Sequence, residues 1–236
     1  MNEKQLSRRV AITLANRSQK QIINKAMIFY TDVIYGNFES ITGAIVEAYP
    51  KKLALGSVSG PEWVAVQQSM SILRQIYFGD DPYKRLNSSK PCARMHNLKE
   101  DVVFSKKLTV ECTAGEVLMI RDCLNLYGRV LMGQMKEIDW TMRSFFWDRI
   151  RNYDHRIAEM VMQIAKTILF NMNPNCSYGI GQRECSLLSR KAYEIQRWME
   201  YDIFKDDPEI QKGHSVLKYG PIRVTKQPRI KLEFVQ

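Results

Sequence analysis

The sequence lacks most of the patterns that mark familiar enzymes. It has no G-x-x-x-x-G-K-[ST] loop and no G-x-G-x-x-G turn after a strand, which excludes the common phosphate- and dinucleotide-binding motifs. Residues 56–60 read Gly-Ser-Val-Ser-Gly, but Val58 stands where a nucleophile elbow requires serine, so this stretch is a serine-rich turn. We therefore expect a protein that is not an enzyme.

Residues that ligate metals are few and scattered. The five cysteines form no C-x-x-C pair, and none of the three histidines stands at ligand spacing from them. We expect reduced structural thiols, no metal site and no cofactor. A nucleophilic pair of Cys92 and His96 stays open as an alternative. Metal binding by Asp80-Asp81 or Asp206-Asp207 also stays open, although each pair precedes a proline and fits a turn.

Long apolar runs and a secretion signal are also missing. No stretch of about 18 apolar residues occurs, so we expect no membrane span and no membrane partner. The first 25 residues are basic and poor in acids, as in a mitochondrial transit peptide, but apolar residues continue directly to Ile28. We expect a cytoplasmic protein.

Positive charge is what the sequence has in excess. The chain has 236 residues, of which 45% are hydrophobic and 25% charged, a globular composition, and its net charge is +10. The excess is clustered in a basic N-terminal helix, in a loop at 84–107 and in a tail at 212–231 that contains six basic residues and no acid. The regions between them are neutral or slightly acidic. This distribution indicates an extended anionic partner.

The apolar spacing predicts an α+β fold that is mostly α-helical. Short strands are expected near residues 102–110 and in the C-terminal tail. We expect one domain over 1–236, or two packed halves at 1–100 and 101–236. Helices are predicted at about 3–35, 38–48, 61–78, 114–131, 134–151, 154–170 and 186–204, and a break of the first helix around 16–18 stays open.

Two segments carry sharper local signals. Thr113 and Glu116 form a capping box, which makes the helix that follows the most certain in the chain. Apolar and charged residues alternate over 230–234, as in a half-buried strand. Pro221 and Pro228 prevent a long ladder there and indicate an edge strand or a free arm.

One segment interleaves cations with aromatic rings, the mixture that single-stranded nucleic acid binding needs. Cations contact phosphates and flat rings stack on bases of any sequence. The aromatic residues could instead belong to the core, and this alternative stays open. The segment contains Arg143, Phe145, Phe146, Trp147, Arg149, Arg151 and Tyr153.

The basic loop and tail repeat this mixture in what we expect to be flexible segments, which suits contact with a nucleic acid backbone. A helix-turn-helix, with helices at 5–14 and 19–29, is a further possibility, although its turn has no glycine. The predicted nucleic-acid-binding residues are Lys84, Arg85, Arg143, Phe146, Trp147, Arg149, Arg151, Lys218, Arg223 and Lys226.

Two stretches resemble a known group of sequences. The first contains 124–129, Leu-Asn-Leu-Tyr-Gly-Arg, and 132–134; the second contains 175–181, Asn-Cys-Ser-Tyr-Gly-Ile-Gly, and 192–195. Across about residues 108–200 the chain resembles a family of uncharacterised open reading frames of tailed bacteriophages and prophages. The resemblance implies a phage origin and action in the cytoplasm of an infected bacterium, and it implies no activity.

These observations lead to two main hypotheses, and an enzyme of unfamiliar type, with His96 or His155 gathered with carboxylates in one pocket, stays open as a third. The first is a phage accessory protein that binds DNA, single strands more than duplex, in transcription or replication; basic phage proteins of this kind include early proteins that recruit an RNA polymerase. The alternative is an interaction factor that binds and modulates a host or phage protein, as a defence inhibitor or polymerase cofactor. The positive charge argues against an acidic DNA mimic.

Overall fold

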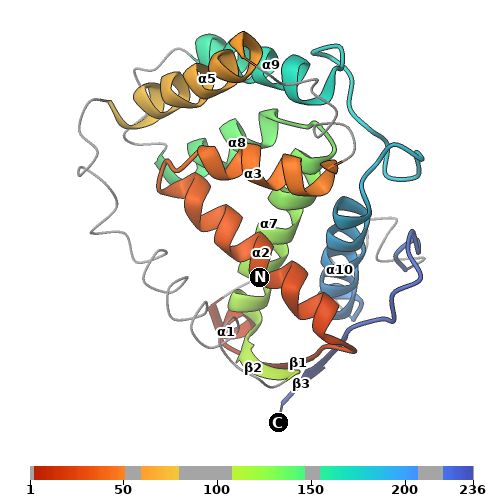
Figure 1. The fold of residues 1–236 in the computed structure, drawn as a ribbon. Helices are drawn as coiled ribbons and strands as arrows, with labels where there is room; N and C mark the ends of the chain where they lie inside the picture. Colours follow the sequence, from red (N-terminus) through yellow and green to blue (C-terminus); the bar gives the residue numbers. More distant parts are fainter. Residues whose placement is uncertain (1–2, 51–59, 80–107, 147–154, 207–219, 236) are drawn as a thin grey trace. The chain divides into compact units, whose positions relative to one another are not determined.

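The computed structural model describes residues 3–50, 60–79, 108–146, 155–206 and 220–235 (Figure 1). These ranges are mostly helical and contain one small antiparallel sheet, so the predicted fold class is confirmed. The elements are α1 (Glu3–Leu6), β1 (Arg9–Thr13), α2 (Arg17–Ile34), α3 (Glu39–Ala48), α5 (Pro61–Phe78), β2 (Thr109–Thr113), α7 (Ala114–Leu131), α8 (Lys136–Phe146), α9 (His155–Phe170), α10 (Leu187–Phe204) and β3 (Lys231–Phe234).

The chain is divided into two compact units. Unit 1 comprises residues 1–28, 90–128 and 190–236, and unit 2 comprises 29–89 and 129–189. The expected boundary near residue 100 lies outside the described residues, so the division into an N-terminal and a C-terminal half stays a prediction.

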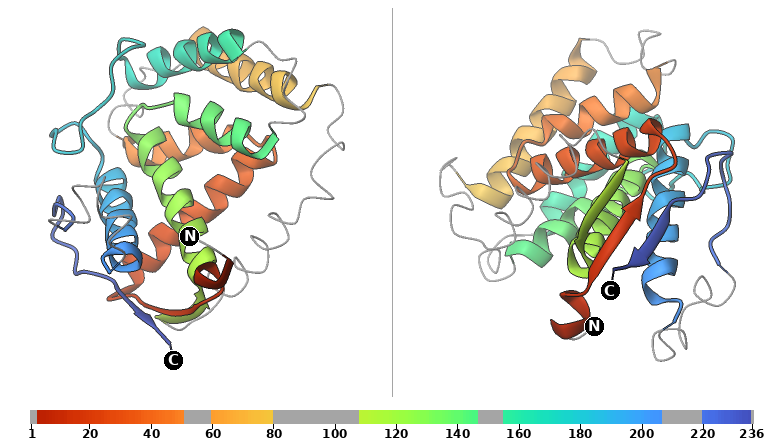
Figure 2. Two further views of the ribbon diagram at one scale, coloured as in Figure 1. Left: turned by 180° about the vertical axis from the view of Figure 1, so that it is seen from behind. Right: turned by 90° about the horizontal axis from the view of Figure 1, so that it is seen from below.

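Unit 1 contains the sheet, with β1 in the middle of the order β2-β1-β3 (Figure 2). Val10 of β1 stands opposite Cys112 of β2 and Phe234 of β3. Burial alternates along β1 and β2, as expected when one face of a sheet is covered. The helical segments of unit 1 lie on that face, and β3 is the predicted edge strand of the tail.

The prediction of a helix over 3–35 is wrong at its start. Residues 9–13 form β1, and helix α2 begins only at Arg17. Val10 and Leu14 fit a helical period, but Val10 and Ile12 fit a strand equally well, and pairing on both edges of β1 decides for the strand. The helix-turn-helix is thereby excluded, because its first helix would occupy the residues of β1.

The predicted capping box joins β2 to α7. The backbone N–H of Thr113 donates to Oε2 of Glu116 at 2.6 Å, and the N–H of Glu116 donates back to Oγ1 of Thr113 at 3.2 Å. The pair thus satisfies backbone donors at the start of α7, as the sequence predicts. Helix α7 ends at Leu131, before Gly133, whose φ of 81° suits glycine.

A carboxylate on α10 holds the C-terminal tail. Glu194 is buried, and its Oε2 accepts hydrogen bonds from the N–H of Val224 at 3.3 Å, the N–H of Thr225 at 2.8 Å and the Oγ1 of Thr225 at 2.7 Å. A buried carboxylate is costly unless such donors surround it. The tail is therefore an ordered strap over 220–235, and the expectation of a flexible or free arm is wrong for these residues.

Further contacts fix the strap along its length. The amide of Gln19 donates to the carbonyl of Pro228, and the amide of Gln227 donates to the carbonyl of Lys191 at 3.1 Å. The guanidinium of Arg229 pairs with the buried carboxylate of Asp202 and lies 4.2 Å from the ring centroid of Trp198. These contacts lead the chain to the edge of β1.

The regular elements of unit 2 that the structure describes are helices, and α5 packs along α9 (Figure 1). Helix α5 has Pro61 at its first turn, as the sequence predicts. Tyr49 links three segments in the core: its hydroxyl donates to the carbonyl of Leu131 at 2.6 Å and accepts from the N–H of Ser186 at 3.2 Å. Burial raises the pKa of Tyr49, so this hydroxyl keeps its proton.

The remaining sequence expectations concern segments at the edges of the described ranges. The predicted strand near 102–110 is seen from residue 109 as β2, and 102–107 lie outside the described residues. Residues 171–185 are not helical, as expected, and the N–H of Tyr178 donates to the carbonyl of Met132 at 2.9 Å. None of the helices that the structure describes is long and apolar enough to cross a lipid bilayer.

The strap can be tested through Glu194. Glu194→Ala removes the acceptor of three hydrogen bonds and should lower the free energy of unfolding by about 3 kcal/mol, because hydrogen bonds to a buried charge are strong. Urea denaturation measures the loss, and trypsin should cleave faster after Arg223 and Lys226. The matched variant Glu233→Ala removes an exposed carboxylate from β3 and should change stability by less than about 0.5 kcal/mol. Equal effects of the two variants would contradict this account of the strap.

Candidate functional site

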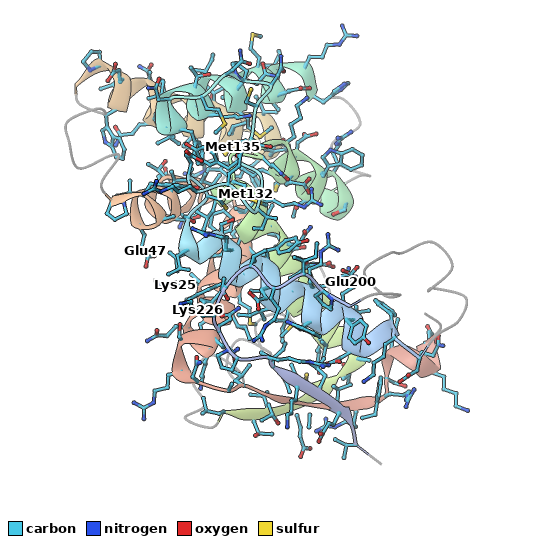
Figure 3. The ribbon with its side chains drawn as sticks, turned by 90° about the vertical axis from the view of Figure 1, so that its right-hand side faces the viewer. Lys25, Glu47, Met132, Met135, Glu200 and Lys226 are labelled. Atoms are coloured by element: carbon cyan, nitrogen blue, oxygen red, sulfur yellow. The ribbon has the colours of Figure 1, made fainter. Side chains whose placement is uncertain are left out.

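Unit 2 has a cavity of about 290 Å³ between the start of α8, one side of α9 and the segment 174–177. Met135 and Met162, both almost fully buried, give it an apolar part. Figure 3 labels Met135 among the side chains of this unit. The other lining residues are Gly133, Gln134, Lys136, Glu137, Trp140, Glu159, Gln163, Lys166, Pro174, Asn175, Cys176 and Ser177.

Lys166 is the buried charge of this cavity. Its side chain donates to the carbonyl of Pro174 at 2.6 Å and to the carbonyl of Cys176. The residue is only 6% exposed, and burial lowers the pKa of its ammonium group. Because an ammonium group has three donors, these two carbonyls leave one N–H of Lys166 for a further acceptor.

The other charges around the cavity are paired with one another. Lys136 forms an ion pair with Glu159. Arg129 contacts Glu137 at 2.8 Å and Gln134 at 3.1 Å. Lys166 is thus the cation of the cavity wall that backbone carbonyls, rather than a carboxylate, hold in place.

Trp140 forms an exposed wall at the mouth of the cavity. It is 66% exposed, an unusual state for so large an apolar ring. The guanidinium carbon of Arg143 lies 5.0 Å from its ring centroid. The guanidinium of Arg143 forms an ion pair with the carboxylate of Asp139 at 2.8 Å. Asp139 also accepts a hydrogen bond from the hydroxyl of Tyr77 at 2.7 Å. Trp140 is therefore a largely exposed flat ring with an oriented cation over one of its faces.

Sequence reasoning missed Trp140, although α8 contains a signal for it. Met135, Ile138 and Met142 are buried at helical spacing, and Trp140 falls on the other side of that pattern. The amphipathic pattern of this helix therefore predicts that Trp140 is exposed.

The structure describes the side chains of three predicted site residues. Arg143 belongs to unit 2, whereas Arg223 and Lys226 belong to the tail in unit 1. Phe146 is the last residue of α8, but its side chain is outside the described part, so the choice between core and platform stays open. The other predicted residues, which lie outside the described ranges, are Lys84, Arg85, Trp147, Arg149, Arg151 and Lys218.

The two tail residues differ in their contacts. Arg223 donates to the carbonyl of Gln227 at 3.0 Å, and its Nε lies 3.8 Å from Glu194, so its charge is partly used within the fold. Lys226 is exposed on the strap (Figure 3), and the described residues offer it no ion pair. Lys226 is therefore the freer of the two to meet an anion.

Helix α9 has an exposed apolar stripe. Ile157, Met160 and Ile164 lie on one side of the helix at spacings of three and four residues, and each is about half exposed. Such a stripe on a surface helix is typical of a contact with another protein.

Catalytic and metal alternatives find no support in the described ranges. No group of three or more His, Cys, Asp or Glu side chains suited to a metal ion occurs there. Cys92 and His96 lie outside those ranges, as do Asp80, Asp81 and Asp207.

The chain was compared with known proteins. Protein-family models, curated protein sequences and solved structures give no match to it. The resemblance to phage open reading frames stays a prediction.

The cysteines provide a test of the cavity. Cys176 lines it and is exposed, whereas Cys112, Cys123 and Cys185 are buried. Burial raises the pKa of Cys112 to about 12 and that of Cys123 well above its usual value, so neither forms the reactive thiolate near neutral pH.

In a Cys92→Ser background, a maleimide should therefore modify Cys176 alone while the protein is folded. Mass spectrometry of tryptic peptides identifies the modified residue, and denatured protein, in which all four thiols should react, is the control. Modification of Cys112 or Cys123 at the rate of Cys176 in the folded protein would contradict the described burial.

Proposed function

We propose that this chain is a non-enzymatic accessory protein that binds single-stranded nucleic acid, DNA in the first instance. The observation that carries the proposal is the exposed ring of Trp140, with Arg143 and Lys136 on the same helix. An exposed aromatic face with cations beside it is the combination that binds unpaired bases and their phosphates.

The spacing on α8 supports this proposal. Lys136, Trp140 and Arg143 are separated by four and three residues, so they lie on adjacent turns of one helix side. Asp139 orients Arg143 without burying it, since the arginine side chain stays about one third exposed. A strand could thus stack a base on the indole while its phosphates meet the two cations.

Clustered charge in the rest of the sequence also supports the proposal. Residues 84–107 include seven basic residues and two acids, and Lys226 is exposed on the strap. Such segments add contacts to the phosphate backbone that do not depend on base sequence. We place this activity in phage transcription or replication, in the cytoplasm of an infected bacterium.

The test is a titration with a fluorescent oligo-dT strand over a range of salt concentrations. The logarithm of the binding constant should fall linearly with the logarithm of salt, with a slope of about −2 or steeper if three or more phosphates are neutralised. Trp140→Ala should weaken binding about tenfold or more, because stacking contributes roughly 1–3 kcal/mol per base.

A matched control is Leu187→Ala, which removes an exposed apolar side chain from the start of α10 and should leave affinity unchanged. Binding that does not respond to salt, or a Trp140→Ala variant with unaltered affinity, would refute strand binding by this face. A duplex that binds more tightly than the single strand would refute the preference for unpaired bases.

The apolar stripe of α9 favours a second candidate, a factor that binds and modulates a host or phage protein such as an RNA polymerase or a defence protein. Ile157, Met160 and Ile164 would form the contact, because burying their exposed apolar surface in an interface lowers the free energy of association. This function needs no nucleic acid.

The stripe predicts a protein partner that stays bound after nucleic acid has been digested. A tagged chain isolated from infected cells should retain one stoichiometric protein after nuclease treatment, and Met160→Glu should release it because a carboxylate would be buried in an apolar interface. Leu187→Glu makes the same chemical change at an exposed site elsewhere in unit 2 and should retain the partner. Loss of every partner on nuclease treatment would favour the first function.

A further inference from the structure

We propose that the cavity of unit 2 takes a single nucleobase of the bound strand, and that the base is one with a ring carbonyl: guanine, cytosine, thymine or uracil. The inference rests on the proposed binding of single strands and adds to it a specific pocket. Its basis is the combination of cavity size, an open aromatic wall and one donor of Lys166 that the two carbonyls leave free.

The size of the cavity sets the size of the ligand. At about 290 Å³ it lies at the lower end of the range for small-molecule sites, which is roughly 300–1,000 Å³. One flat heterocycle is therefore a better match than a dinucleotide or a peptide. The rest of the strand would remain outside, near the exposed cations of α8.

Two surfaces of the cavity suit a flat apolar ring. The indole of Trp140 stands at the mouth, and the side chains of Met135 and Met162 line the interior. Methionine is adaptable in shape and makes favourable contacts with aromatic rings. A base between these residues would be stacked on one face and in contact with thioethers further in.

Polar groups in the wall suit the edges of a base. Gln134, Gln163, Asn175 and Ser177 contribute amides and a hydroxyl, which can both donate and accept hydrogen bonds. Since Lys136 is paired with Glu159 and Glu137 with Arg129, the charges of these groups largely cancel. This leaves Lys166 as the cation of the cavity wall without a carboxylate partner, and an acceptor atom on the edge of a base can meet its remaining N–H.

Lys166 accounts for the expected choice of base. Two of its three donors are taken by the carbonyls of Pro174 and Cys176, and the third is available to an acceptor in the cavity. A ring carbonyl oxygen is such an acceptor and has two lone pairs, whereas adenine accepts only at ring nitrogens, each with one lone pair in the plane of the ring. Because a hydrogen bond from a charged donor contributes about 1.5–3 kcal/mol, a poorer fit of this bond should make adenosine bind several-fold more weakly than guanosine, cytidine or thymidine.

The test uses the full chain labelled with ¹³C at its methionine methyl groups. The NMR signals of Met135 and Met162 are assigned with Met135→Leu and Met162→Leu, and the protein is titrated with the four nucleosides and separately with oligo-dT. Both probes should shift these two signals, with the smallest effect from adenosine. The same oligo-dT titration by fluorescence reports strand binding independently.

A pair of variants links the signals to the cavity. Asn175→Leu combined with Ser177→Leu changes two exposed residues of the rim, removes their polar groups and fills the mouth. It should weaken nucleoside binding about tenfold. Arg183→Leu combined with Glu184→Leu changes two exposed residues of the same connecting segment outside the cavity, keeps the net charge, and should bind as the parent does.

The outcomes separate this inference from the proposed function. Oligo-dT that binds without shifting Met135 or Met162 would overturn the base pocket and leave strand binding intact. Nucleosides that shift both signals while oligo-dT fails to bind would support the pocket and overturn strand binding. The absence of both effects would overturn both, and adenosine that binds as tightly as guanosine would overturn the role given to Lys166.

Discussion

Each charged group that is buried in this chain needs hydrogen-bond or ion-pair partners, and the packing inside each unit depends on the segments that supply them. In unit 1 one carboxylate oxygen of Glu194 accepts three hydrogen bonds from the tail, and the carboxylate of Asp202 is paired with Arg229. In unit 2 the ammonium group of Lys166 is held by the carbonyls of Pro174 and Cys176. A buried charge without such contacts would cost several kcal/mol, so each one fixes the path of the segment that satisfies it.

This constraint also changes what the net charge of +10 means. Arg229 and, in part, Arg223 are basic residues of the tail whose charge stabilises α10, so they are less available to an anionic partner than the sequence suggests. Lys226 remains exposed, Lys136 is exposed but paired with Glu159, and Arg143 lies over the ring of Trp140. The net charge of the tail therefore overstates how much of the tail is free to contact an anion. It also gives no indication of the exposed aromatic ring and cations on α8.

The parts of the fold that could be predicted from the sequence are those with local causes. The capping box of Thr113 and Glu116 and Pro61 at the start of α5 act within a few residues, and both helices begin as predicted. Strand β1 was mistaken for helix because its stability comes from β2, about a hundred residues later, and from β3 near the end of the chain. A short apolar pattern that fits both periods is decided by such distant partners.

The candidate site was harder to predict for the same physical reason. The frequency of aromatic and basic residues predicts a binding segment at 143–153, whereas the exposed aromatic ring in the structure is Trp140. The exposure of Trp140 depends on which side of α8 is buried. Lys166 lies within an apolar helix and has no carboxylate near it in sequence, and only the return of 174–176 supplies its acceptors. Burial lowers the pKa of Lys166, and the carbonyls stabilise its ammonium group without neutralising it, so no carboxylate pairs with Lys166 at the wall of a cavity whose other charges are paired. The cavity therefore has a positive side at Lys166, which a sum of the charges of its lining residues would not reveal.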